Sequence, residues 1–151
     1  MNSPARFPWT DAYLLGYAPM DHTHREFVEL VDALRSCDDS AFVGHLHAFR
    51  LHAEAHFLQE NTWMADTAYP PMACHVDEHN AVLKSVREVQ AQLAAGGAVA
   101  DARGLVEALA DWFPGHADYL DAPLSQWMVR QRMGGKPVVL KRNILDKAAA
   151  E

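Results

Sequence analysis

Cysteine, lysine and long apolar runs are scarce in this sequence, and each scarcity excludes a class of protein. The 151 residues contain only two cysteines, Cys37 and Cys74. They are too few and too far apart for a disulfide framework and match no zinc motif, so we expect free thiols in a reducing cytoplasm. No apolar run approaches the ~20 residues of a membrane-spanning helix, and the first residues lack the apolar segment of a signal peptide.

Basic residues are also in the minority, which argues against nucleic acid and anionic lipid as partners. The formal net charge is −7, and a negative chain repels both polyanions. Residues 122–151 are the exception, with six basic and two acidic residues, and we interpret this basic end as a solvated tail. The residue in excess is histidine, with nine copies against four lysines. Histidine is the commonest metal ligand among side chains, so the positions of the histidines carry the argument.

The hydrophobic pattern predicts an all-α protein. Apolar residues keep helical spacing over four segments, about 19–36, 40–64, 72–94 and from 101 onward. Four amphipathic helices joined by short loops indicate an up-down-up-down four-helix bundle. We assign the chain to three parts: a non-helical N-terminal arm (1–18), the bundle (19–121), and a short, partly helical C-terminal extension with a loosely held end (122–151).

Metal-ligand residue types occur on every predicted helix. Residues four apart lie only about 40° from each other around a helix, so His56 with Glu60, and His75 with His79, each share a face. The start of the first helix, the end of the second, the start of the third and the end of the fourth lie at one level of such a bundle. Seven candidate ligands fall at that level: His24, His56, Glu60, His75, His79, His116 and Asp121.

Five imidazoles and two carboxylates are a large set for one metal ion and suit two. Imidazole suits iron, copper and zinc, and carboxylates bridge pairs of hard ions well. With both carboxylates and an oxide or hydroxide as bridges, a metal with three histidines is saturated, whereas a metal with two keeps an open position. An open position on a redox-active metal is where O₂ would bind.

The ligand motifs resemble those of the hemerythrin family, and of the single-domain bacterial hemerythrins in particular. They read His56-Phe57-Leu58-Gln59-Glu60 and His75-Val76-Asp77-Glu78-His79, with His24 before them and His116 and Asp121 after them. A lone histidine pair would be a weak signal, but all seven family positions are filled in the right order. The resemblance covers about residues 9–121.

The resemblance implies two iron ions (Fe²⁺/Fe³⁺) bridged by oxide or hydroxide. It divides the ligands into three groups: His75, His79 and His116 on the saturated iron, His24 and His56 on the iron that takes O₂, and Glu60 and Asp121 as bridges. It also implies an apolar wall that keeps water out. Our candidates for this wall, which equally read as plain bundle core, are Phe57, Leu83, Trp112 and Phe113.

Several positions depart from the family pattern. Asn61 stands where a second glutamate is common, and Thr23 where a glutamine is usual, so we expect changed hydrogen bonds without loss of metal. Pro114-Gly115 disfavours a helix interior directly before His116. Because His116 and Asp121 are five apart, they do not share a face of a straight α-helix, and we predict a kink or a π-type turn between them.

The remaining histidines receive ordinary interpretations. His52 lies one turn before His56 and could line the pocket or donate to bound oxygen, but we interpret it as a buried or water-bonded side chain. We expect the other three either at the surface or in contact with the ligands without binding metal: His22, His45 and His47.

The leading functional prediction is reversible O₂ binding by a carrier, storage or delivery protein that is not an enzyme. Such a protein could supply an oxygen-requiring enzyme, as a monomer or weak homo-oligomer. The alternatives are a diiron peroxidase, an oxidase or a nitric-oxide scavenger, although diiron oxygenases in bundles usually have carboxylate-rich sites. An oxygen- or iron-sensing module normally has an output domain, which we do not find. The predicted open position disfavours a purely structural metal.

Overall fold

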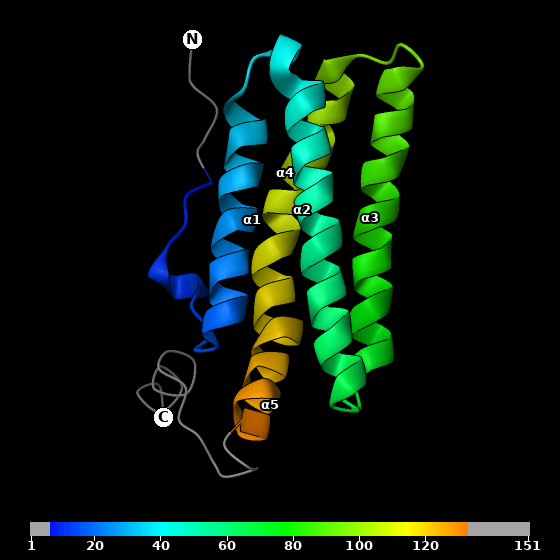
Figure 1. Cartoon of the computed structure of the whole chain (residues 1–151). Helices are drawn as coiled ribbons and strands as arrows, with labels where there is room; N and C mark the ends of the chain where they lie inside the picture. The colour runs from blue at the N-terminus through cyan, green and yellow to red at the C-terminus, as the bar shows by residue number, and fades with distance from the viewer. Residues whose placement is uncertain (1–6, 133–151) are drawn as a thin grey trace.

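The computed structural model describes residues 7–132, which form a four-helix bundle (Figure 1). Its elements are the 3-10 turn η1 (Asp11–Tyr13), α1 (Ala18–Ser36), α2 (Asp39–Asp66), α3 (Met72–Ala94), α4 (Val99–His116), the π-helical segment η2 (Ala117–Asp121) and α5 (Ala122–Arg132). α1 packs against α2 and α4, and α3 packs against the same two helices. The described part of the chain has no strand, so the all-α prediction is confirmed. The loosely held end predicted after Gly134-Gly135 lies outside the described residues.

The described part of the N-terminal arm, residues 7–17, is held against the bundle by α1. The Asp21 carboxylate accepts hydrogen bonds from the backbone N–H groups of Leu15 (2.7 Å) and Gly16 (3.1 Å), and the Asp32 carboxylate accepts one from Phe7 (2.8 Å). The ring of Phe7 is buried in the larger of the two hydrophobic clusters described below. The arm was predicted to be non-helical, and η1 is a single turn of 3-10 helix within it.

Arg103 binds the turn between α1 and α2, at the end of the bundle away from the candidate ligands. Arg103 on α4 donates to the backbone carbonyls of Cys37 (2.6 Å) and Leu34 (3.2 Å), and its guanidinium pairs with Asp39 at the start of α2 (2.9 Å). The last carbonyls of a helix have no partner within the helix. Arg103 therefore satisfies the end of α1 and ties it to α2 and α4.

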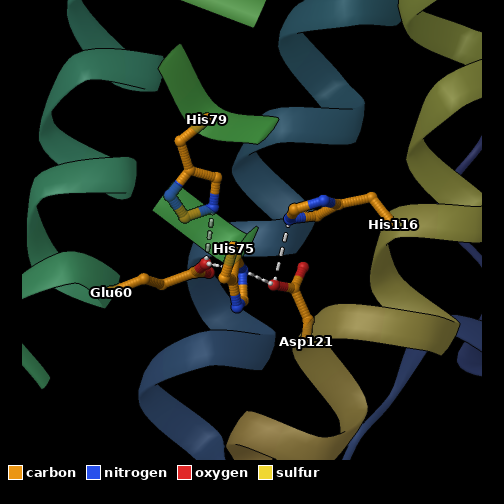
Figure 2. A group of neighbouring side chains, drawn as sticks. All are labelled: Glu60, His75, His79, His116 and Asp121. Atoms are coloured by element: carbon orange, nitrogen blue, oxygen red, sulfur yellow. Dashed lines mark ion pairs between the residues drawn. The ribbon is translucent and has the colours of Figure 1, made fainter. Parts of the chain in front are cut away.

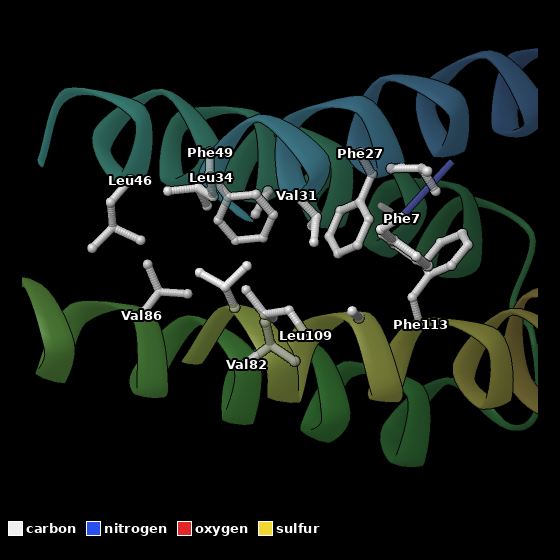
Figure 3. Packing of buried hydrophobic residues seen from close by; sticks show 14 of the residues in the cluster. Phe7, Phe27, Val31, Leu34, Leu46, Phe49, Val82, Val86, Leu109 and Phe113 are labelled. Carbon is white, nitrogen blue, oxygen red and sulfur yellow. The ribbon is translucent and has the colours of Figure 1, made fainter. Parts of the chain in front are cut away.

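Apolar side chains fill the bundle on both sides of the level at which the candidate ligands lie. The larger cluster extends toward the α1–α2 turn and includes Phe27, Val31, Leu34, Leu46, Phe49 and Val86 (Figure 3). The smaller cluster, at the other end, is rich in methionine and includes Leu15, Met20, Met64, Leu124 and Met128. On α1, for example, His24 comes between Met20 and Phe27. The polar centre is therefore enclosed by apolar packing.

The fourth helix continues where the sequence predicted an end. α4 passes through η2 directly into α5, so the predicted boundary between bundle and extension lies inside a continuous helical run. Pro114 sits inside α4 and lacks the N–H that a regular helix interior uses. The predicted π-type turn is confirmed at Ala117–Asp121. None of the described helices is long and apolar enough to cross a membrane.

Phe49→Ala tests how far the larger cluster stabilises the fold. The Phe49 ring is fully buried and lies 5.2 Å from the Phe27 ring, so its removal leaves a cavity. We expect the free energy of unfolding to fall by about 3–5 kcal/mol, measured by urea titration of the metal-free protein. Val43→Ala on the same helix is the control, because Val43 is 58% exposed and should change stability by less than about 0.5 kcal/mol. Equal effects of the two substitutions would contradict the assigned core.

Candidate metal centre

The structure brings all seven candidate ligands together between the helices. Figure 2 shows five of them: Glu60, His75, His79, His116 and Asp121. Every one is buried, with at most 4% of its surface exposed. They come from each helix of the bundle: His24 from α1, His56 and Glu60 from α2, His75 and His79 from α3, His116 from the end of α4 and Asp121 from the end of η2. Their nitrogen and oxygen atoms form two groups that could each hold a cation: Glu60, His75, His79, His116 and Asp121 in one, and His24, His56 and Glu60 in the other.

Glu60 belongs to both groups because its two oxygens face different histidines. Oε1 lies 3.1 Å from Nε2 of His79 and 3.3 Å from Nε2 of His75. Oε2 lies 2.6 Å from Nε2 of His56 and 3.5 Å from Nε2 of His24. A carboxylate held in this way can bridge two cations.

Asp121 divides its oxygens in the same way. Oδ1 lies 2.9 Å from Nε2 of His75 and 3.1 Å from Nε2 of His116, whereas Oδ2 lies 3.0 Å from Nε2 of His24. The π-helical segment makes this possible, because i→i+5 bonding brings residues five apart, such as His116 and Asp121, to the same side of the helix. The site thus has two carboxylates between a set of three histidines and a set of two.

Several of the buried ligand atoms have no hydrogen-bond partner. The atoms without a hydrogen-bond partner include Nε2 of His24, His75, His79 and His116, Oε1 of Glu60, and both carboxylate oxygens of Asp121. Buried polar atoms without partners cost free energy. A cation between them would satisfy several at once, and imidazole with carboxylate is a donor set that suits iron. The residues therefore fit a pair of metal ions.

Charge in the metal-free centre is balanced by protons. Burial opposes protonation of His24 and His75, but the carboxylates of Asp121 and Glu60 outweigh it and raise the pKa of His24 to about 10 and that of His75 to about 9. Burial alone would raise the pKa of both carboxyl groups, yet the surrounding histidines hold each pKa below its usual range. Metal ions would replace these protons.

Aromatic rings enclose the histidines. Phe57 stacks flat on His79, with ring centroids 4.1 Å apart and planes 9° apart, and Trp112 stacks on His116 at 4.2 Å. Phe113 meets His24 edge-on at 5.3 Å. Three of the four predicted wall residues thus touch candidate ligands directly. The fourth, Leu83, is buried in the larger cluster.

Two further residues hold the outward-facing nitrogens of the histidines. Nδ1 of His116 donates to Oε1 of Glu78 (2.8 Å), which also accepts the indole N–H of Trp112 (2.9 Å). Nδ1 of His79 donates to the amide oxygen of Asn61 (2.9 Å). Each of these bonds leaves Nε2 as the nitrogen with the free lone pair. Sequence reasoning identified Asn61 only as a departure and missed Glu78, which resembles any solvated helix glutamate.

The remaining histidines lie outside the centre. His22 and His47 are exposed and His45 is half-buried. His52 is half-buried, with its ring centroid 5.9 Å from that of His56 and its Nε2 3.7 Å from Oε1 of Glu26. None of these four belongs to the two groups of ligand atoms. The two groups of ligand atoms thus contain five of the nine histidines: His24, His56, His75, His79 and His116.

Fold and site together define a class, the four-helix bundles that hold cations with histidines and carboxylates. The family model described as the hemerythrin HHE cation binding domain matches residues 15–124. This chain belongs to the hemerythrin family. A bacteriohemerythrin of Ralstonia nicotianae is 39% identical over 82% of this chain and 89% of its own length. A bacteriohemerythrin of Stenotrophomonas maltophilia is 27% identical over 84% of this chain and 90% of its own length. The family implies a non-haem diiron site.

The affinity of the metal-free protein for Zn²⁺ should rise with pH. With pKa values of about 10 and about 9, His24 and His75 stay protonated up to about pH 8, and zinc must displace these protons. We expect the Kd to fall by about tenfold or more per pH unit between about pH 6 and pH 8, measured by competition with a coloured chelator. His24→Gln removes one proton and should flatten the slope. An affinity independent of pH would contradict this charge balance.

Proposed function

We propose that this protein binds two iron ions, bridged by oxide or hydroxide, and takes up O₂ reversibly at one of them. The proposed ligands are His75, His79 and His116 for one iron, His24 and His56 for the other, and Glu60 and Asp121 as bridges. The observation that carries the proposal is the division of each carboxylate between the two histidine sets. Because one set has three histidines and the other two, the second iron would keep an open position.

Two iron ions held by these residues would supply the electrons for reversible binding of O₂. The protein holds the ligands in place and keeps water away. The rings of Phe57 and Trp112 lie flat against His79 and His116, and the Phe113 ring covers one edge of His24. Apolar packing on both sides completes the enclosure. Exclusion of water would keep the centre from being left in its oxidised form.

Several features favour a binding protein over an enzyme. The site has five imidazoles and only two carboxylates, whereas diiron oxygenases in helical bundles use carboxylate-rich sets. Membership of the hemerythrin family supports the same choice. The proposal includes delivery of O₂ to an oxygen-requiring enzyme by a monomer or weak homo-oligomer. It also includes a cytoplasmic setting, in keeping with two cysteines that form no disulfide with each other.

The optical spectrum tests reversible binding. An anaerobically reduced sample exposed to air should gain a visible absorption band, lose it on deoxygenation, and repeat the cycle. Metal analysis should find about two irons per chain. Irreversible bleaching with turnover of an added peroxidase, oxidase or nitric-oxide substrate would instead favour the enzyme alternative. Full iron content with no response to O₂ would refute both.

Ligand substitutions test the proposed assignment. His79→Ala removes a ligand of the saturated iron, so iron content should fall close to zero after purification and dialysis. Asp121→Ala removes one bridge and should weaken the magnetic coupling between the irons, measured by magnetic susceptibility. His47→Ala is the control, because His47 is exposed on α2 and should leave iron content unchanged. Retention of both irons in His79→Ala would refute the assignment.

A further inference from the structure

The candidate ligand histidines differ in the hydrogen-bond partners of their Nδ1 atoms. Only two of the five histidines have an Nδ1 partner among the described residues, since Nδ1 of His24, His56 and His75 has none. His116 donates to Glu78, a carboxylate, whereas His79 donates to Asn61, a neutral amide. Two ligands of the same proposed iron thus face acceptors of different charge.

Asn61 and Phe57 together fix the ring of His79. The Asn61 oxygen, 2.9 Å away, accepts the Nδ1 proton, and the Phe57 ring lies parallel to the imidazole at 4.1 Å. Both contacts come from α2, the helix that also carries Glu60. With its proton on Nδ1, His79 presents the Nε2 lone pair 3.1 Å from Oε1 of Glu60. One helix therefore sets both the carboxylate and the orientation of the facing imidazole.

The charge of the acceptor affects the electron density of the imidazole. A carboxylate draws the Nδ1 proton strongly and makes Nε2 a better donor to a metal, while a neutral amide does so less. A nearby negative charge also stabilises the more positive, oxidised metal. A neutral acceptor behind His79 therefore favours the reduced form.

We propose that Asn61 is a positioning residue that fixes His79 and, by being uncharged, keeps the reduction potential of the iron pair higher than a carboxylate would. This inference rests on the proposed function, because only the reduced pair takes up O₂. It assigns two separable roles to one side chain. The acceptor oxygen holds the ring, and the absence of charge sets the potential.

Two substitutions separate these roles. Asn61→Asp keeps an acceptor oxygen and adds a charge, whereas Asn61→Ala removes the acceptor. Zn²⁺ affinity of the metal-free protein should fall by about tenfold or more in Asn61→Ala, and should be kept or increased in Asn61→Asp. The midpoint potential of the iron-loaded protein, measured by mediated optical redox titration, should fall in Asn61→Asp.

Matched controls come from neighbouring positions. Gln59→Glu adds the same charge two residues earlier on α2, at an exposed side chain whose amide oxygen accepts a hydrogen bond from the Thr23 hydroxyl. Its midpoint potential should move much less than that of Asn61→Asp. Glu78→Gln makes the reverse change behind His116, so the potential should rise. Circular dichroism and thermal unfolding identify any variant that fails to fold.

The outcomes separate this inference from the proposed function. Wild-type zinc affinity in folded Asn61→Ala would overturn the role in fixing His79. A shift in Asn61→Asp no larger than that in Gln59→Glu would overturn the role in setting the potential. If the wild-type protein shows no O₂ cycle while both effects are present, the O₂ proposal fails and the assignment of Asn61 holds.

Discussion

Two buried carboxylates impose the constraint on which the rest of the structure depends. Glu60 and Asp121 are fully enclosed, and a buried charge without compensation is strongly destabilising. The compensation must be positive, whether it comes from protons on histidine or from metal ions. Five histidines on all four helices face these oxygens. The register of each helix is therefore tied to the others by charge as well as by apolar packing.

The remainder of the fold strengthens and protects this arrangement. Apolar clusters on both sides exclude water, and electrostatic attraction is stronger where water is absent. The π-helical segment is a local departure from the regular helix that turns Asp121 inward, and such segments are often found at functional sites. α5, which follows the π-helical segment, holds it in place. Leu124 and Met128 pack in the smaller cluster, and the Ser125 hydroxyl donates a hydrogen bond to the Leu15 carbonyl.

The sequence predicted the parts of the site that depend on helical periodicity. His75 and His79 share a face because they are four apart, and their depth follows from the alternating direction of the helices. The turn between His116 and Asp121 was predicted only because the spacing of five conflicts with a straight helix. Glu78 was missed, since a single glutamate on a helix carries no sign of its partner across the interface. Such pairings depend on helix rotation and side-chain direction, which periodicity does not fix.

The arm contributes to the centre although it carries none of the candidate ligands. The Phe7 ring lies 6.2 Å from that of Phe113, which in turn meets His24 at 5.3 Å. Only the Phe113 ring thus lies between Phe7 and a candidate ligand. The Asp32 carboxylate accepts a hydrogen bond from the backbone N–H of Phe7 and holds it in place. A shortened chain that began at α1 would keep all seven ligand residues and yet leave one side of Phe113 open to solvent. The apolar wall around the centre therefore includes a residue of the N-terminal arm, which precedes the four helices in the sequence.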